Sequence, residues 1–288
     1  MSVAGDQAAI HSAAAHWRRR ALLAGTALAL LTLAPGGPAR AVDGTWLPSP
    51  PSDDFNTGTN WSSSPDVPDG TASFGASSTT SIAFSASTTV GGLTLNVGAA
   101  AYQFAHPSGG DLIFNGAGIV INGGSLRLET NNSSNITFSN SSTAGSATLV
   151  LNNGVVQFNT SSTAGSANFT LGNGTVLNFI DASTAGSASF TLAQTVQITF
   201  FNTSSASTAS FTLGPNGLLS SNTLLFRHSS NASSASFTLN GSSSVSFVET
   251  SAAGSATFTL NSSAFLVFNN SSTADRSEEH TSELQSQR

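Results

Sequence analysis

The chain has no cysteine and no lysine, and only 8% of its 288 residues are charged. Without cysteine it can form neither disulfides nor thiolate metal sites. Between Val42 and Asp275 the only Lys or Arg residues are Arg127 and Arg227, against ten carboxylates, a net charge of −8. Such a surface offers nothing to a phosphate backbone, and this excludes nucleic acid as a partner.

Helical periodicity is also absent after residue 42, and apolar residues instead alternate with Ser and Thr. In the segment Ala188–Leu192, this period of two places Ala, Phe and Leu on one face of a strand. A second strand follows in each unit and ends in Phe, as in Leu177–Phe179. Turn-forming residues such as Gly172-Asn173-Gly174 separate the two strands.

Two series of Phe residues repeat with one common period. The first series comprises Phe169, Phe190, Phe211, Phe237 and Phe258, in steps of 21, 21, 26 and 21 residues. The second comprises Phe138, Phe158, Phe179, Phe200, Phe226, Phe247 and Phe268, in steps of 20, 21, 21, 26, 21 and 21. Two series in register indicate one structural unit copied many times.

A unit of 20–21 residues with two strands is too short for a four-stranded propeller blade but fits one turn of a parallel β-helix. The sequence therefore predicts an all-β solenoid of about 20–21 residues per coil, with the Phe residues in two continuous internal ladders. The single 26-residue step places five extra residues at the turn around Gly214–Gly217. An insertion confined to a turn should leave the rungs intact.

The N-terminus has the layout of a secretory signal peptide. Arg18-Arg19-Arg20 precedes the apolar run Ala21–Leu33, and Ala39-Arg40-Ala41 provides a small-residue cleavage site. The apolar run is too short for a membrane span. We expect residues 1–41 to be a signal peptide cleaved before Val42, and the proline- and aromatic-rich residues 42–72 to form an N-terminal cap. The β-helix repeats are expected over residues 73–274.

Several motifs together resemble one family. They are Asp54-Phe55-Asn56, Asn60-Trp61, Val67-Pro68-Asp69-Gly70, Ala72-Ser73-Phe74, Val90-Gly91-Gly92-Leu93, Gly116-Ala117-Gly118-Ile119 and the Phe-x-Asn…Ser-Thr-Ala-Gly-Ser-Ala units. Residues 45–274 are similar to passenger regions of bacterial autotransporter proteins. The resemblance implies a right-handed β-helix carried to the surface of a Gram-negative cell by a C-terminal outer-membrane β-barrel, which does not follow residue 274 here.

The C-terminal residues break the repeat. Residues 276–288 are charged, lack a period of two, and resemble a translated sequencing adapter. We therefore expect residues 275–288 to be a non-native or disordered tail outside the solenoid, with the last coil ending as an open edge near Ser272. On this interpretation the gene is truncated before its remaining coils and barrel.

Catalytic residues are poorly supported. Enzymes that cleave polysaccharides use paired carboxylates, but the regular repeats between Phe138 and Phe268 carry only Asp181 and Glu249, three coils apart. Asp181 is expected in a turn ladder with Asn140, Asn159, Asn202 and Asn269, Arg227-His228 in an exposed loop, and His106 in a turn beside Pro107. Neither a nucleophile motif nor a calcium-binding repeat is present. No enzyme activity, catalytic residue, metal or cofactor is expected.

Three functional classes remain. The sequence favours an exported, non-catalytic cell-surface passenger acting in adhesion or self-association, with surface glycans, host or neighbouring cells, or the chain itself as partners. Contact with a membrane would come only through the missing barrel. The alternatives are a fragment of a carbohydrate-active β-helix enzyme and an ice- or crystal-binding solenoid. The outward Thr column suggests the second alternative: Thr170, Thr191, Thr212, Thr238 and Thr259.

Overall fold

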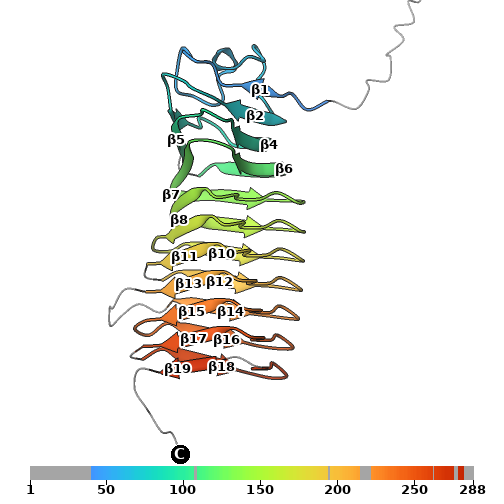
Figure 1. The fold of residues 1–288 in the computed structure, drawn as a ribbon, viewed down its shortest axis with the longest axis vertical. Helices are drawn as coiled ribbons and strands as arrows, with labels where there is room; N and C mark the ends of the chain where they lie inside the picture. Colours follow the sequence, from blue (N-terminus) through green and yellow to red (C-terminus); the bar gives the residue numbers. More distant parts are fainter. Residues whose placement is uncertain are drawn as a thin grey trace, which may run out of the picture. The chain divides into compact units, whose positions relative to one another are not determined.

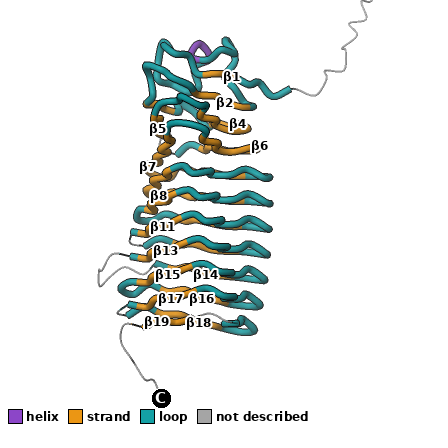
Figure 2. The backbone as a smooth tube through the Cα atoms, viewed as in Figure 1, coloured by secondary structure: helices purple, strands orange, loops and turns teal. Residues whose placement is uncertain are grey.

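A β-solenoid of about nine turns, with about 21 residues per turn, makes up the computed structural model of this chain from Ala41 onward (Figure 1). The structure describes residues 40–106, 109–193, 195–214, 222–261, 263–275 and 278–281. These residues contain no α-helix, and a single 3-10 turn, η1 (Gly58–Asn60), lies at the N-terminal end (Figure 2). The predicted all-β class and coil length are confirmed. Of the predicted signal peptide, residues 1–39 lie outside the described part.

The repeated coils contain two strands each, as the period-two pattern predicts. The first strands are β9 (Asn168–Leu171), β11 (Ser189–Leu192), β13 (Ser210–Leu213), β15 (Ser236–Leu239) and β17 (Thr257–Leu260). The second strands are β10 (Val176–Phe179), β12 (Gln197–Phe200), β14 (Thr223–Phe226), β16 (Ser244–Phe247) and β18 (Phe265–Phe268). Each strand pairs in parallel with its counterpart one coil away, and identical positions stack.

The N-terminal coils use longer and less regular strands. They are β1 (Gly44–Thr45), β2 (Thr71–Phe74), β3 (Ser81–Ala83), β4 (Thr88–Leu95), β5 (Ala101–His106), β6 (Asp111–Ile121), β7 (Ser125–Phe138) and β8 (Thr148–Phe158). Strands β7 and β8 bend around a corner, so that one end of β8 pairs with β9 and the other end pairs with β10. We call the column of strands that contains β9 the first face and the column that contains β10 the second face. Both faces thus continue into the N-terminal coils.

Each coil also has a third side, which the sequence pattern did not predict. In the first coils it is a regular ladder of β1, β2 and the C-terminal halves of β4 and β6. In later coils it narrows to single parallel bridges, which join Gly118, Thr143, Thr163, Thr184, Ser205, Asn231, Ala252 and Thr273 in succession. One bridging residue per coil is too short to show a period of two, and for this reason the sequence revealed only two strands.

Two internal Phe ladders run through the solenoid, as predicted. Rings on the second face stack at 4.6–5.0 Å from Phe114 through Phe268. Rings on the first face stack at 4.7–5.0 Å from Phe169 through Phe258. The two ladders meet edge to face at 6.1–6.2 Å. The stacking distance equals the spacing of paired strands, so the aromatic contacts and the backbone hydrogen bonds favour the same register.

The insertion leaves the rungs intact. Gln197 aligns with Thr223 and Phe200 with Phe226, although the step between these coils is 26 residues. Residues 215–221 lie outside the described part of the chain. The extra length is therefore accommodated between Leu213, the last residue of β13, and Thr223, the first residue of β14.

The segment expected to be an N-terminal cap is folded against the first rungs. Trp46 and Trp61 are buried, with ring centroids 5.0 Å apart, and both pack against Phe74 of β2. Phe55 packs against Trp61 at 4.9 Å. These aromatic side chains cover the end of the core, which would otherwise be open to water.

The expected exclusion of residues 276–288 from the solenoid is wrong for Glu278–Thr281. These residues form β19, which pairs in parallel with β17 and aligns Thr257 with Glu278. The spacing of 21 residues is one coil period, and an open strand edge pairs through its backbone whatever the side chains are. Among the described residues, β18 pairs on one side only, with β16, and Phe265 is 57% exposed. Residues 282–288 lie outside the described part.

Candidate functional site

Each coil turns a corner just after its second strand, and one residue there has a left-handed backbone. The corner column, as we call these residues, has φ of 55–63° and comprises Asn140, Thr160, Asp181, Asn202, His228, Glu249 and Asn270. Asn, Asp and His tolerate this conformation better than Thr or Glu does. Thr160 and Glu249 are therefore the members of the column whose backbone conformation is the least favourable for their residue type.

This column corrects the expected turn ladder. Asn140, Asp181 and Asn202 do share one position, but Asn159 and Asn269 stand one residue earlier, before Thr160 and Asn270. The Phe ladder fixes the register, because every member of the corner column lies two residues beyond an inward Phe. Similarity of residue type alone had suggested the wrong alignment.

Asp181 has the structural role expected of it. The backbone N–H of Thr160 donates to Asp181 Oδ2 at 3.3 Å, and the Asn202 side-chain amide donates to Asp181 Oδ1 at 3.0 Å. These partners lie on the coils before and after Asp181. The carboxylate therefore links three consecutive corners.

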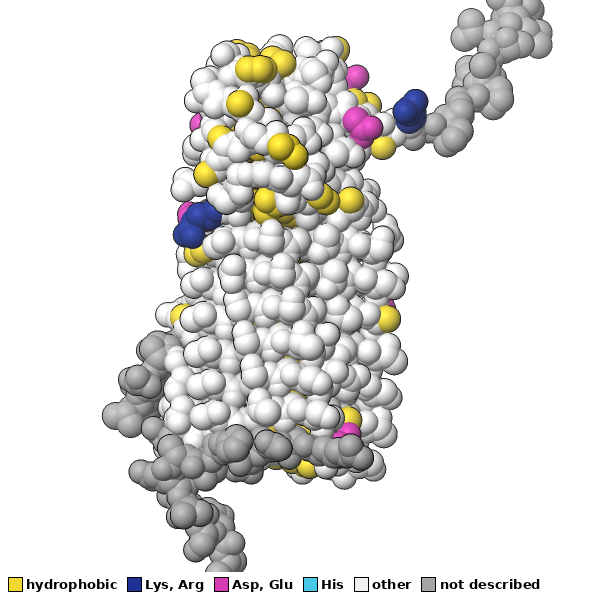
Figure 3. Space-filling view, viewed as in Figure 1, with side chains coloured by type: hydrophobic (Ala, Val, Ile, Leu, Met, Phe, Trp, Pro, Cys, Tyr) yellow, Lys and Arg dark blue, Asp and Glu magenta, His cyan; other side chains and the backbone are white. Residues whose placement is uncertain are grey.

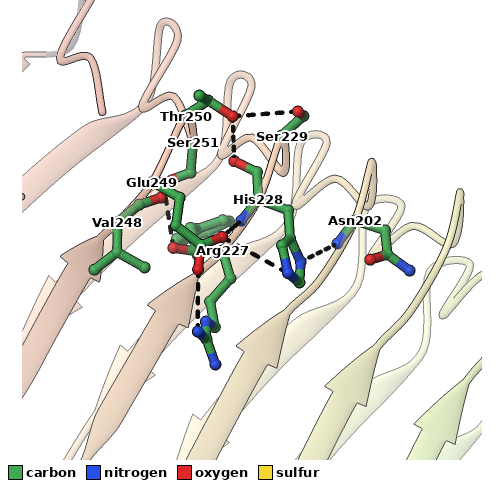
Figure 4. Close-up of polar contacts among 9 residues, drawn as sticks. Asn202, Arg227, His228, Ser229, Val248, Glu249, Thr250 and Ser251 are labelled. Carbon is green, nitrogen blue, oxygen red and sulfur yellow. Dashed lines mark hydrogen bonds and ion pairs between the residues drawn. The ribbon is translucent and has the colours of Figure 1, made fainter. Parts of the chain in front are cut away.

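Three polar residues at the corner that follows β14 and β16 form a cluster of opposite charges (Figure 4). Arg227 Nη2 lies 3.0 Å from Glu249 Oε1, and the backbone N–H of His228 donates to Glu249 Oε2 at 2.6 Å. His228 Nε2 lies 3.7 Å from the same oxygen. His228 Nδ1 in turn accepts the backbone N–H of Asn202 at 3.2 Å.

The cluster repeats the arrangement at Asp181. In both places a side chain of the corner column accepts the backbone N–H of the corner residue one coil earlier. A left-handed residue at a corner turns its N–H out of the ladder, and the next coil's side chain satisfies that donor. Arg227-His228 was expected in an exposed loop. Their side chains are about half exposed, and both contact Glu249. Glu249 lies 21 residues, one coil, after His228, so the repeat period could have predicted this contact.

The electrostatics of the cluster favour a fixed carboxylate rather than a catalytic acid. The backbone hydrogen bond from His228, and next the hydrogen bond from Arg227, lower the pKa of Glu249 below its ordinary value near 4.5. A general acid requires a carboxyl whose pKa is raised instead. Asp181 is three rungs away from Glu249, roughly 14 Å at the spacing of paired strands. Paired carboxylates in glycosidases are about 5–9.5 Å apart.

The other candidate residues do not assemble into a reactive site. His106, expected in a turn, is instead the last residue of β5, buried with its ring 5.4 Å from that of Phe84, while Pro107 lies outside the described residues. A shallow depression of about 330 Å³ on the second face is lined by Asp111, Ile113, Asn135, Thr137, Val155 and Gln157. Asn135 already donates to Asp111 there at 2.8 Å. No group of three metal-binding side chains occurs among residues that the structure describes.

The outward side of the first face is a regular array of uncharged polar side chains, which we call the hydroxyl face. One column comprises Asn168, Ser189, Ser210, Ser236 and Thr257, and the other comprises Thr170, Thr191, Thr212, Thr238 and Thr259. Both columns lie in strict register over β9, β11, β13, β15 and β17, and most of their side chains are exposed. Figure 3 shows how few charged side chains lie on one side of the molecule.

The second face differs in chemistry. Its outward positions include Val176, Leu225 and Phe265, which are partly or largely exposed. An unbroken double column of Ser, Thr and Asn is thus a property of the first face. The sequence had indicated the Thr column, and the register of the strands adds the neighbouring column to it.

No protein-family model, curated protein or solved structure matches this chain. Within the described residues, no helix has the length and apolar character needed to cross a membrane.

Proposed function

We propose that this chain is an exported, non-catalytic cell-surface solenoid, similar in role to an autotransporter passenger, that binds other surfaces or copies of itself through the hydroxyl face. The observation that carries the proposal is the double column of uncharged polar side chains in register over five coils. The signal-peptide layout of residues 18–41 and the motifs shared with passenger regions support export.

The physical chemistry of the hydroxyl face suits adhesion. Ser, Thr and Asn side chains both donate and accept hydrogen bonds, as do the hydroxyl groups of glycans and the same side chains of a second copy. One such hydrogen bond contributes only about 0.5–1.5 kcal/mol net. A rigid array repeats the contact many times, so that weak contacts add up to a stable attachment. The wide separation of Asp181 and Glu249 supports a non-catalytic role.

Purified protein coupled to beads tests this proposal. Clustering of the beads measures self-association, and retention of the beads on glycan-coated surfaces or intact cells measures adhesion. Replacing Thr191 and Thr212 by Lys places two charges on the hydroxyl face without changing the core. The matched control replaces Gln197 and Thr223 by Lys, on the second face of the same two coils.

We expect the hydroxyl-face variant to lose most clustering or retention, because charges must be desolvated and like charges repel across a symmetric contact. The control variant should behave as the unchanged protein does. Equal retention by both variants, with unfolding temperatures equal to that of the unchanged protein, would contradict the proposal.

The in-register Thr column also favours a second candidate, an ice- or crystal-binding solenoid. Only the rung with Thr257 and Thr259 has Thr in both columns, and the other rungs pair Thr with Ser or Asn. Inhibition of ice recrystallisation by the unchanged protein, lost in the hydroxyl-face variant, would support this candidate over adhesion.

A further inference from the structure

The first residue of the expected mature chain is held by the loop that precedes β2. The backbone N–H of Val42 donates to Asp69 Oδ1 at 2.6 Å. The carbonyl oxygen of Val42 accepts the backbone N–H groups of Asp69 at 3.1 Å and Gly70 at 2.9 Å. Val42 is therefore fixed by three hydrogen bonds to two consecutive residues.

The preceding peptide bond is positioned for cleavage. Ala41 is exposed, and the hydrogen bonds that hold the chain to the cap begin at Val42. The small residues at 39 and 41 place the expected signal-peptidase cut between Ala41 and Val42. The expected cleavage site thus lies directly before the first residue that hydrogen bonds hold to the cap.

The cap itself has no positive side chain. Residues 42–72 contain five carboxylates and neither Lys nor Arg. Asp43 is nearest in sequence to the amino terminus, and its Oδ1 accepts the backbone N–H of Thr71 at 2.6 Å. Asp66 lies in the loop that ends at Asp69, and no contact joins its carboxylate to Val42 in the described structure. A positive charge placed at the nitrogen of Val42 would meet an acidic environment.

We propose that Asp69 is a binding site for the mature amino terminus, formed when export removes residues 1–41; this rests on the export in the proposed function. Hydrolysis of the Ala41–Val42 bond adds one water, leaving a carboxylate on Ala41 and an amine on Val42 that takes up a proton. The nitrogen already lies 2.6 Å from Asp69 Oδ1. Cleavage converts a neutral N–H donor there into an ammonium group, and the hydrogen bond becomes charge-assisted.

The new ion pair fixes the start of the solenoid. Val42 precedes β1, which forms the outermost rung by pairing with β2. Chain termini fray unless they are anchored, and a frayed outer strand exposes an edge that can pair with other chains. Processing therefore stabilises the cap after export, whereas the uncleaved chain has only the neutral hydrogen bond from Val42 to Asp69.

Titration of the Val42 amine tests the proposal. The chain is prepared from Val42 onward by removing an N-terminal fusion, and the amine is followed by NMR in the unchanged protein and in Asp69→Asn. A nearby carboxylate favours the charged amine, whose ordinary pKa is about 7.7–8.0. We expect a pKa higher by about half a pH unit or more than in Asp69→Asn. Asp66→Asn, in the same loop, is the matched control and should leave the amine pKa unchanged.

Thermal unfolding gives a second readout. Asp69→Asn should lower the unfolding temperature of the chain that begins at Val42 more than that of the full chain, which has no amine at this position. This difference in unfolding temperature should be present at pH values below the ordinary pKa of an amine. It should disappear as the pH rises through the raised pKa of the Val42 amine. The same amine pKa in the unchanged protein and in the Asp69→Asn variant would overturn the proposal. N-terminal sequencing of exported protein separately tests export, since a start other than Val42 would contradict the cleavage and leave the titration result unaffected.

Discussion

Replacement of Phe179 by Ala should destabilise the middle of the solenoid strongly. The ring is fully buried between Phe158, at 4.9 Å, and Phe200, at 4.6 Å, and it meets Phe190 edge to face at 6.2 Å. Truncating a buried Phe to Ala costs about 3–5 kcal/mol. Loss of two stacked neighbours places Phe179 at the upper end of this range, because each aromatic pair contributes about 0.5–1.5 kcal/mol beyond area burial.

Two other positions calibrate this effect. Among the described residues, Phe268 of β18 stacks on Phe247 alone and is only partly buried, so Phe268→Ala should cost much less. Thr170 points outward from β9, so Thr170→Ala should change stability little. A carboxylate at position 179 would be buried without a partner, and Phe179→Asp should unfold the neighbouring coils.

Hydrogen exchange combined with urea unfolding measures these differences. Each coil contacts only its neighbours, so exchange should accelerate first in β8, β10 and β12 and less in distant coils. Equal effects of Phe179→Ala and Thr170→Ala on unfolding would refute the assignment of inward and outward positions.

Three further predictions concern the corners and the absence of catalysis. No reducing ends or unsaturated sugars should be released from a polysaccharide panel, and release abolished by Asp181→Asn would overturn this expectation. Ser183→Ala should be neutral or stabilising, because the buried hydroxyl of Ser183 has no hydrogen-bond partner among the described residues. Ser251→Ala should instead destabilise, because the hydroxyl of Ser251 donates to Val248 O at 2.7 Å. The unfolding midpoints of the two variants measure the difference. Because the pKa of Glu249 is lowered in the folded chain, its carboxylate stabilises the fold at pH values above the ordinary pKa of Glu. This stabilisation is lost as the pH falls through the lowered pKa of Glu249. The difference in unfolding temperature between the unchanged protein and Glu249→Gln should therefore shrink on acidification, and a constant difference from about pH 7 to about pH 3 would contradict this.

The repeat made much of the fold predictable. Residues such as Phe190 and Leu192 recur at one period, and a period of two tells which side of the strand they occupy. Stacking of identical residues then follows from parallel pairing one coil apart. The insertion near Gly214 could also be placed from the count between Phe residues, because register depends on the strands rather than on the turn.

Features that depend on single residues or on backbone edges could not be predicted in the same way. The third side consists of one bridging residue per coil, as at Thr184, and leaves no alternating pattern. Strand β19 pairs with β17 through the main chain, so its sequence carries no signal for the contact. The contact of His228 with Glu249 depends on the corner register, which the Phe positions determine and residue similarity does not.

Site-specific cross-linking tests most directly whether the hydroxyl face makes the contact. The chain has no natural cysteine, so one photoreactive group can be attached at Thr191→Cys on the hydroxyl face, or at Gln197→Cys on the second face of the same coil. Illumination on intact cells, or of concentrated protein, should give cross-links to a cell-surface partner or a second copy from position 191 and few from position 197. Cross-links that form from position 197 and are absent from position 191 would contradict the proposed role of the hydroxyl face.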